Sequence, residues 1–388
     1  MTLDELLVAA AARGASDVHL RAGEPPFVRI AGALEQWTSM PTLTAEHMES
    51  TAGRILSLDQ AERFRNLMHL DVAWHAQGAG RVRANVFKQR GTIGISLRLI
   101  PDLVPSIEQL GLAPTVVNFA TESRGVVLVT GVTGSGKSTT LASLIDLINR
   151  TRAVHILTLE DPIEFVHHNV LSVVTQREIG IDAPNYASGV RAALRQDPDV
   201  ILIGEMRGPA TIKAALTAAS TGHLVFATLH TTDATETVNR IVSCFPTHHQ
   251  ATIRAQLASV LRATISQRLL PRADGHGLAL AAEVMVSTPY IRDCLASRHK
   301  TALIPDAIVA GAAQYGMQSF DQSILGLVNA GTVDSEEALR WVTNVEEFKM
   351  QLSGITRGST LSVGAQTAAA ASARSPATES FASSRAAR

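Results

Sequence analysis

One short stretch constrains the fold of this chain more than any other feature, and it reads Gly131-Val132-Thr133-Gly134-Ser135-Gly136-Lys137-Ser138-Thr139. It fits the pattern G-x-x-x-x-G-K-[ST], in which glycines let backbone N–H groups curve around phosphate oxygens. An apolar, strand-like run precedes it at 126–129 and a helix-like run follows at 141–148, which is the context that the pattern requires. We therefore expect a nucleoside triphosphate here, with Lys137 at the β- and γ-phosphates and Ser138 as a ligand of Mg²⁺. A chance glycine-rich turn is the alternative, and the flanking strand and helix argue against it.

The composition describes a globular chain with ample material for hydrophobic cores. Its 388 residues predict two or three domains, and 46% of them are hydrophobic while 18% are charged. A formal net charge of −1 weakens, without excluding, a helicase or a DNA-packaging protein, because such proteins usually carry a basic stripe. The cysteines, Cys244 and Cys294, stand far apart, so neither a zinc site nor a disulfide framework is indicated.

The sequence shows no targeting signal and no membrane span. Asp4 and Glu5 stand where a signal peptide would carry bases. The apolar run 278–286 is too short for a span, and Glu283 interrupts it. We therefore expect a soluble, cytoplasmic protein whose contact with a membrane runs through partners.

Short alternating runs predict an α+β module over residues 1–100. An amphipathic helix is expected at 1–14, where four apolar side chains share one stripe: Leu3, Leu6, Leu7 and Ala10. Strands are expected at 18–20, 27–30, 81–87 and 93–99, and residues 45–68 are expected to be helical. Prolines then mark a connector at 101–118.

From residue 119 strands and helices alternate, which predicts an α/β fold with a mainly parallel sheet over 119–287. The expected strands are 126–130, 154–159, 200–204 and 223–229, and helices at 137–149 and 209–220 lie between them. A helical part follows over 288–352, with helices near 289–297, 303–314, 319–330 and 335–352. The tail, 353–388, is expected to be disordered because it offers few large apolar groups to bury.

Carboxylates follow two of the expected strands, where ligands of α/β sheets bind. Glu160 and Glu164 follow the strand at 154–159, and they either hold the Mg²⁺ shell and orient water or form a solvated acidic turn. Glu205 follows the strand at 200–204 in a Walker B arrangement, from which it can hold a Mg²⁺-bound water or polarise the attacking water. The alternative for Glu205 is a surface glutamate after a core strand.

Polar groups at the end of the strand 223–229 are candidates for sensing the γ-phosphate. Thr228 and His230 could relay its loss, although a histidine at a strand end is as often structural, and His223 is expected to be structural.

Arginine can stabilise phosphoryl transfer by about 10³–10⁵ in rate. The candidates are Arg81, Arg83, Arg98, Arg191 and Arg195, each with a solvated strand or helix face as the alternative. A domain that supplies arginine to a neighbour's nucleotide would imply a ring.

In order along the chain, these segments resemble the boxes of the secretion-type ring ATPases of type II secretion and type IV pili. The resemblance runs from about residue 3 to about residue 352 and is carried by 15–20, 131–139, 156–167, 197–207 and 221–233. It implies a PAS-like N-terminal domain, a RecA-like P-loop ATPase domain with a helical C-terminal part, and a homohexamer that binds ATP and Mg²⁺ between domains. It also implies that Glu205 is the catalytic glutamate, Glu160 and Glu164 are Asp-box carboxylates, and His230 is the His-box histidine. Arg81 and Arg98 match the family's nucleotide-reaching arginines by position.

Within that family the chain is most similar to the type IV pilus retraction ATPases, because it lacks the extra N-terminal domain and the four-cysteine insert of assembly ATPases. The resemblance implies pilus retraction and twitching motility at the inner face of the cytoplasmic membrane. It implies an inner-membrane platform protein and a second retraction ATPase as partners, and no nucleic acid. Val132 replaces the usual proline, and the segment Tyr290–Ser297 lacks the terminal Arg-Glu pair of the retraction signature, while 316–322 matches. The alternatives are an accessory ATPase of the PilU type, another secretion or assembly ATPase, a nucleotide-binding scaffold, and a RecA-like nucleic-acid translocase.

Overall fold

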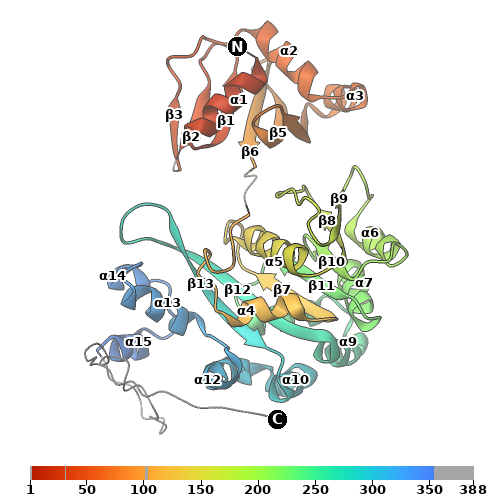
Figure 1. Cartoon of the computed structure of the whole chain (residues 1–388), viewed down its shortest axis with the longest axis vertical. Coiled ribbons are helices and arrows are strands. Elements are labelled where there is room, and N and C mark those ends of the chain that lie inside the picture. The colour runs from red at the N-terminus through yellow and green to blue at the C-terminus, as the bar shows by residue number, and fades with distance from the viewer. Residues whose placement is uncertain (1, 31, 101–103, 354–388) are drawn as a thin grey trace, which may run out of the picture.

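The computed structural model describes residues 2–30, 32–100 and 104–353. Figure 1 shows two lobes, each built around its own sheet. The expected disorder of the tail, apart from Ser353, lies outside the described residues.

The N-terminal lobe is an antiparallel sheet in the order β3-β2-β1-β6-β5-β4 with helices packed on it. Its elements are α1 (Leu3–Ala12), β1 (Ala15–Arg21), β2 (Phe27–Ile30), β3 (Ala33–Gln36), α2 (Ala45–Ile55), α3 (Leu58–Leu67), β4 (His69–Ala76), β5 (Gly80–Gln89) and β6 (Thr92–Leu99). The stripe expected on α1 is buried in the core of this lobe. The helical character expected at 45–68 is confirmed. The segment forms two helices, α2 and α3, because Leu56 is extended and Ser57 caps a new helix.

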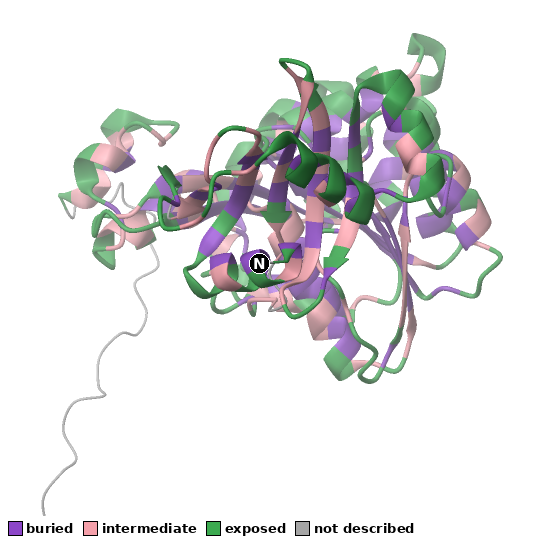
Figure 2. Ribbon diagram, turned by 90° about the horizontal axis from the view of Figure 1, so that it is seen from above, coloured by how far each residue is buried: buried purple, intermediate pink, exposed green. Residues whose placement is uncertain are grey.

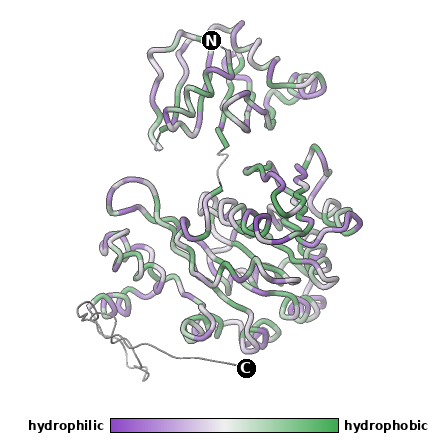
Figure 3. Tube along the Cα trace, in the orientation of Figure 1, coloured by the Kyte–Doolittle hydropathy of each residue, from purple (hydrophilic) through white to green (hydrophobic). Residues whose placement is uncertain are grey.

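The second lobe is a sheet in the order β13-β12-β7-β11-β10-β8-β9, parallel except for the pair β12–β13. Its strands are β7 (Gly125–Thr130), β8 (His155–Glu160), β9 (Val173–Glu178), β10 (Val200–Ile203), β11 (Leu224–Leu229), β12 (Leu261–Pro271) and β13 (Leu278–Val286). Every residue of β7, β10 and β11 is buried, because helices cover both faces of the sheet. Figure 2 colours the ribbon by the burial of each residue, and Figure 3 colours the Cα trace by hydropathy, with hydrophobic residues in green. The mainly parallel α/β arrangement is confirmed.

The helices of the second lobe cover both faces of its sheet. They are α4 (Thr115–Asn118), α5 (Lys137–Thr151), α6 (Tyr186–Ala193), α7 (Pro209–Ser220), α8 (Ala234–Ser243) and α9 (Thr247–Val260). α5 packs on one face, and α6 to α9 contribute to the core on the other. Ile107 and Leu112, from the expected connector, pack into the core beside α5.

The C-terminal helices belong to two different cores. They are α10 (Pro289–Ala296), α11 (Ile304–Ala310), α12 (Ala312–Tyr315), α13 (Phe320–Asn329), α14 (Ser335–Ala338) and α15 (Val345–Leu352). α10 and α11 pack into the main core of the sheet, whereas α13 to α15 form a separate cluster against the β12–β13 hairpin. The single helix expected over 335–352 is wrong, because Asn344 caps α15 as a new helix. Among the residues that the structure describes, no helix is both long and apolar enough to cross a bilayer.

Candidate active site

The loop 131–136 lies between the buried strand β7 and helix α5, as its sequence predicts. Gly131, Gly134 and Gly136 have φ values of +144°, +82° and +87°, which residues other than glycine rarely adopt. A Cβ on Gly131 would lie 2.4 Å from Ser135 Oγ and 2.6 Å from the Gln267 carbonyl oxygen. The loop therefore depends on the absence of a side chain at Gly131 for its shape.

Lys137, the first residue of α5, is buried and holds the loop from inside. Its Nζ donates hydrogen bonds to the carbonyl oxygens of Gly131 (2.9 Å) and Val132 (2.8 Å). Burial lowers the pKa of Lys137, and the nearby carboxylates of Glu205 and Glu164 oppose that shift. The ammonium group thus lies between the loop and two acidic side chains.

A cleft of about 200 Å³ opens beside Lys137, at the carboxyl ends of the parallel strands. Most of the predicted site residues line it, namely Thr133, Gly134, Lys137, Ser138, Glu160, Glu164, Glu205 and His230. The remaining loop residues lie outside this lining: Gly131, Val132, Ser135, Gly136 and Thr139. The fold therefore brings the phosphate loop and all three predicted carboxylates to one cavity.

Glu205, just after β10, is held by the side chains of two neighbouring segments. Its Oε2 accepts a hydrogen bond from Arg207 Nε at 2.7 Å, and its Oε1 lies 3.1 Å from His230 Nε2. Thr228, on β11, donates to the carbonyl oxygen of Gly204. These contacts tie the end of β10 to the end of β11, so Glu205 has a fixed position that faces Lys137.

Glu160, at the end of β8, is partly buried and hydrogen-bonded. Its Oε1 accepts from Thr158 Oγ1 at 2.6 Å and from Gln176 Nε2 at 3.2 Å. Burial raises the pKa of Glu160, and these hydrogen bonds only partly offset that effect. Glu160 is thus a more basic carboxylate than an exposed one.

The donors at the cleft fit a hard divalent cation. Ser138 offers a hydroxyl and Glu205 a carboxylate, and both line the cavity with Lys137. Oxygen ligands of these types, completed by phosphate oxygens and water, are what Mg²⁺ prefers.

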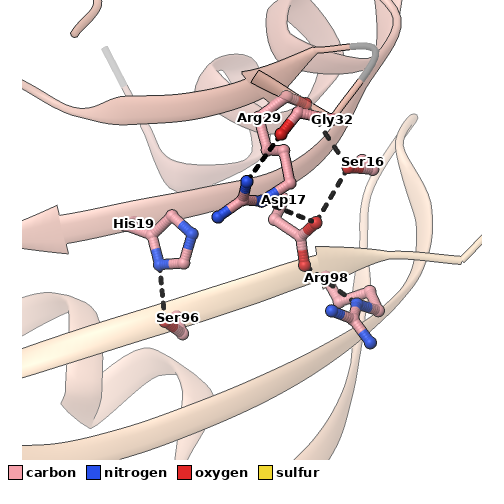
Figure 4. Close-up of polar contacts among 7 residues, drawn as sticks. All are labelled: Ser16, Asp17, His19, Arg29, Gly32, Ser96 and Arg98. Carbon is pink, nitrogen blue, oxygen red and sulfur yellow. Dashed lines mark hydrogen bonds and ion pairs between the residues drawn. The ribbon is translucent and has the colours of Figure 1, made fainter. Parts of the chain in front are cut away.

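Arg98 lies away from the cleft, on the N-terminal lobe (Figure 4). Its Nε donates to Asp17 Oδ1 at 2.8 Å, while 63% of the arginine side chain remains exposed. Burial opposes ionisation of Asp17, but hydrogen bonds from Ser16 and Arg98 lower its pKa overall. Beside this cluster His19 Nδ1 lies 2.7 Å from Ser96 Oγ. Arg98 is therefore held at the surface through its Nε, and its Nη atoms make no hydrogen bond to the residues that the structure describes.

Arg81 connects the two lobes. From β5 its Nη2 donates to Glu178 Oε2, on β9, at 2.5 Å. The same oxygen accepts from the backbone N–H of Ile163, in the turn that carries Glu160 and Glu164. Arg81 therefore contacts the support of the acidic turn and does not line the cleft.

Tyr186 in the cleft and Arg207 beside Glu205 were not among the predicted site residues. Tyr186, the first residue of α6, lines the cavity, and burial together with Asp161 raises its pKa. No spacing in the sequence connects α6 to the site. Arg207 was within reach of prediction, because it stands two residues after Glu205 at the end of the same strand.

Replacement of Gly131 tests the geometry of the loop. We expect Gly131→Ala to weaken ATP binding by about tenfold or more, because the added methyl forces Ser135 and the β12 backbone apart. Gly134→Ala is the matched control, since its Cβ would meet no atom within 4 Å and only backbone strain remains. Titration with a fluorescent ATP analogue measures both. Equal losses in the two variants would show that the close contacts at Gly131 are unimportant.

The sequence and the fold of this chain are similar to those of known proteins. The family model described as type II/IV secretion system protein matches residues 1–302. The type IV pilus retraction ATPase PilT of Pseudomonas aeruginosa is 43% identical over 90% of this chain and 100% of its own length. The type IV pilus ATPase PilU of the same organism is 34% identical, with 91% of each chain covered. A crystal structure of the pilus retraction motor PilT with bound ADP matches with a TM-score of 0.82 and 40% identity, over 89% of this chain and 98% of that one.

Proposed function

Because the chain belongs to the type II/IV secretion system protein family, we propose that it is a hexameric motor that hydrolyses ATP to power retraction of a type IV pilus. The observation that carries this proposal is the convergence of Lys137, Glu164 and Glu205 on one cleft beside the phosphate loop. The similarity to the retraction ATPase PilT over nearly the whole of both chains supports the choice of motor.

In this proposal residues 1–100 form a PAS-like domain and 119–287 a RecA-like ATPase domain, joined by the connector 101–118. The helical part 288–352 completes the second lobe. The six subunits form a ring in the cytoplasm, at the inner face of the membrane. The ring acts on an inner-membrane platform protein, with a second retraction ATPase as a further partner.

The side chains of the cleft divide the work of hydrolysis. Lys137 and the loop N–H groups hold the β- and γ-phosphates, and Ser138 and Glu205 would hold Mg²⁺, Glu205 through water. When bound, this ion neutralises charge on the phosphate oxygens. Glu205 accepts the proton of the attacking water, and its contacts with Arg207 and His230 keep it in place. Glu160 and Glu164 orient water on the opposite wall of the cleft.

Arg98 is proposed to act on the nucleotide of a neighbouring subunit, because it is exposed and does not reach its own cleft. Arg98→Ala should lower kcat by about 10³-fold. Mixing inactive Arg98→Ala subunits with inactive Glu205→Gln subunits should restore activity to roughly a quarter, since random assembly pairs intact halves at that frequency. A mixture as inactive as its components would place Arg98 outside the catalytic site.

An accessory role of the PilU type is the second candidate, and the segment of α10 favours it. Ala296 and Ser297 stand at the end of this helix where the retraction signature carries an Arg-Glu pair. Arg292 is exposed, and its Nη1 donates to the Ser287 carbonyl oxygen.

Deletion of the gene, scored for surface pili and twitching, tests the proposed function. Excess pili with lost twitching is the expected result for a retraction motor. Cells without surface pili would indicate that the protein drives pilus assembly and not retraction. Unchanged pili and motility would indicate the accessory role or another secretion machine.

A further inference from the structure

A buried carboxylate, Glu283, lies outside the cleft and has no part in the chemistry described above. It interrupts an otherwise apolar strand, β13, and only 8% of it is exposed. Burying a carboxylate is costly unless hydrogen bonds compensate, so its position calls for a physical reason.

The partners of Glu283 come from two segments that adjoin parts of the active site. Its Oε1 accepts from the backbone N–H of Ala234, the first residue of α8, at 2.8 Å. The same oxygen accepts from Ser266 Oγ, on β12, at 3.3 Å. Ser266 Oγ in turn accepts from Thr130 Oγ1, on β7, at 3.1 Å.

Strand register explains why these groups meet. Glu283 pairs with Ser266 across β13 and β12, and Ser266 pairs with Thr130 across β12 and β7. Thr130 is the residue before Gly131, where the phosphate loop begins. Ala234 follows the segment that contains His230, and the buried Thr231–Thr237 hydroxyl pair, 2.7 Å apart, fixes that segment to α8.

We propose that Glu283 is a positioning residue for ATP hydrolysis, which holds the segment of His230 at a fixed distance from the strand that carries the phosphate loop. The chain of bonds runs from Ala234 through Glu283 and Ser266 to Thr130. His230 contacts Glu205, so a displacement at α8 changes the position of the catalytic carboxylate. The inference rests on the proposed ATPase function.

The charges around Glu283 make its role sensitive to pH. Burial and the neighbouring Asp233 raise its pKa to about 7, while the Ala234 N–H, Ser266 and Arg268 favour the ionised form. Arg268, from β12, is itself attracted by Asp321 of α13. Ionised Glu283 accepts hydrogen bonds roughly twice as strong as the neutral acid does.

Glu283→Gln keeps the length and an acceptor oxygen but removes the charge. We expect wild type and variant to have the same kcat at pH 6, and wild type to be about fivefold faster at pH 8.5, with KM for ATP within about twofold. Folding raises the pKa of Glu283, so the protonated carboxyl favours the folded state. The free energy of unfolding of wild type therefore falls as pH rises through 7. The variant should therefore gain in unfolding temperature relative to wild type above pH 7.

Ser266→Ala tests the other half of the chain of bonds, and Met285→Leu is the control, a volume-conserving change on the same face of β13. Ser266→Ala should lower kcat at pH 8.5, and adding Glu283→Gln should cost no further activity, because both act through one chain of bonds. Met285→Leu should have an unchanged kcat–pH profile. A wild-type to Glu283→Gln ratio that does not vary with pH, or additive losses with Ser266→Ala, would overturn the inference. Wild-type protein without ATP turnover would instead overturn the proposed function.

Discussion

Replacing Glu205 by Gln is expected to lower kcat for ATP hydrolysis by about 10²–10³-fold and to leave ATP binding intact. The amide cannot take the proton of the attacking water. It still fills the same space between Arg207 and His230, so the loop and the cleft keep their shape. Single-turnover measurements separate the chemical step from binding, and the loss should be in that step.

The control for this variant is Glu122→Gln. Glu122 is an acidic side chain of the same lobe that contacts Arg262 at 3.3 Å and does not line the cleft. It should retain full turnover. An unimpaired Glu205→Gln enzyme would mean that another group prepares the water, and Glu160 would become the first candidate because its raised pKa makes it the more basic carboxylate.

Replacing Lys137 by Ala should have the opposite signature, with ATP binding weakened by about 100-fold or more. In the proposed site Lys137 supplies the positive charge at the β- and γ-phosphates, and its Nζ donates hydrogen bonds to two carbonyl oxygens of the loop. Its removal takes the ammonium charge away from beside Glu205 and Glu164, so the cleft becomes more negative and repels the triphosphate.

Thermal unfolding with and without ATP distinguishes the two variants. ATP should raise the unfolding temperature of wild type and of Glu205→Gln, and should leave Lys137→Ala unchanged. Lys213→Ala, which removes an exposed lysine of α7, is the matched control and should behave as wild type does. An ATP-dependent rise in Lys137→Ala would contradict the assignment of the phosphate site.

The sequence predicted the parts of this site that are encoded locally. The strand–loop–helix around 131–139 follows from glycine spacing and flanking apolar runs, and the structure has it within a residue or two. Glu160 and Glu205 were predicted because each follows a buried run, and a parallel sheet places such ends at one edge.

What the sequence could not provide was the order of the strands and the contacts that depend on it. β11 lies beside β10, which brings His230 to Glu205, but no spacing in the chain encodes that neighbour relation. β12 and β13 were not predicted as strands because their alanines and mixed polar residues give no clear alternation. The line from Thr130 to Glu283 therefore emerged only from the register of those strands.

Retraction of single fluorescently labelled pili in living cells tests the central claim most directly. The strain to compare with wild type carries Glu205→Gln at the chromosomal locus, so the protein is present and folded but does not turn over ATP. The account predicts pili that extend normally and then remain extended. Retraction at the wild-type rate in that strain would contradict it.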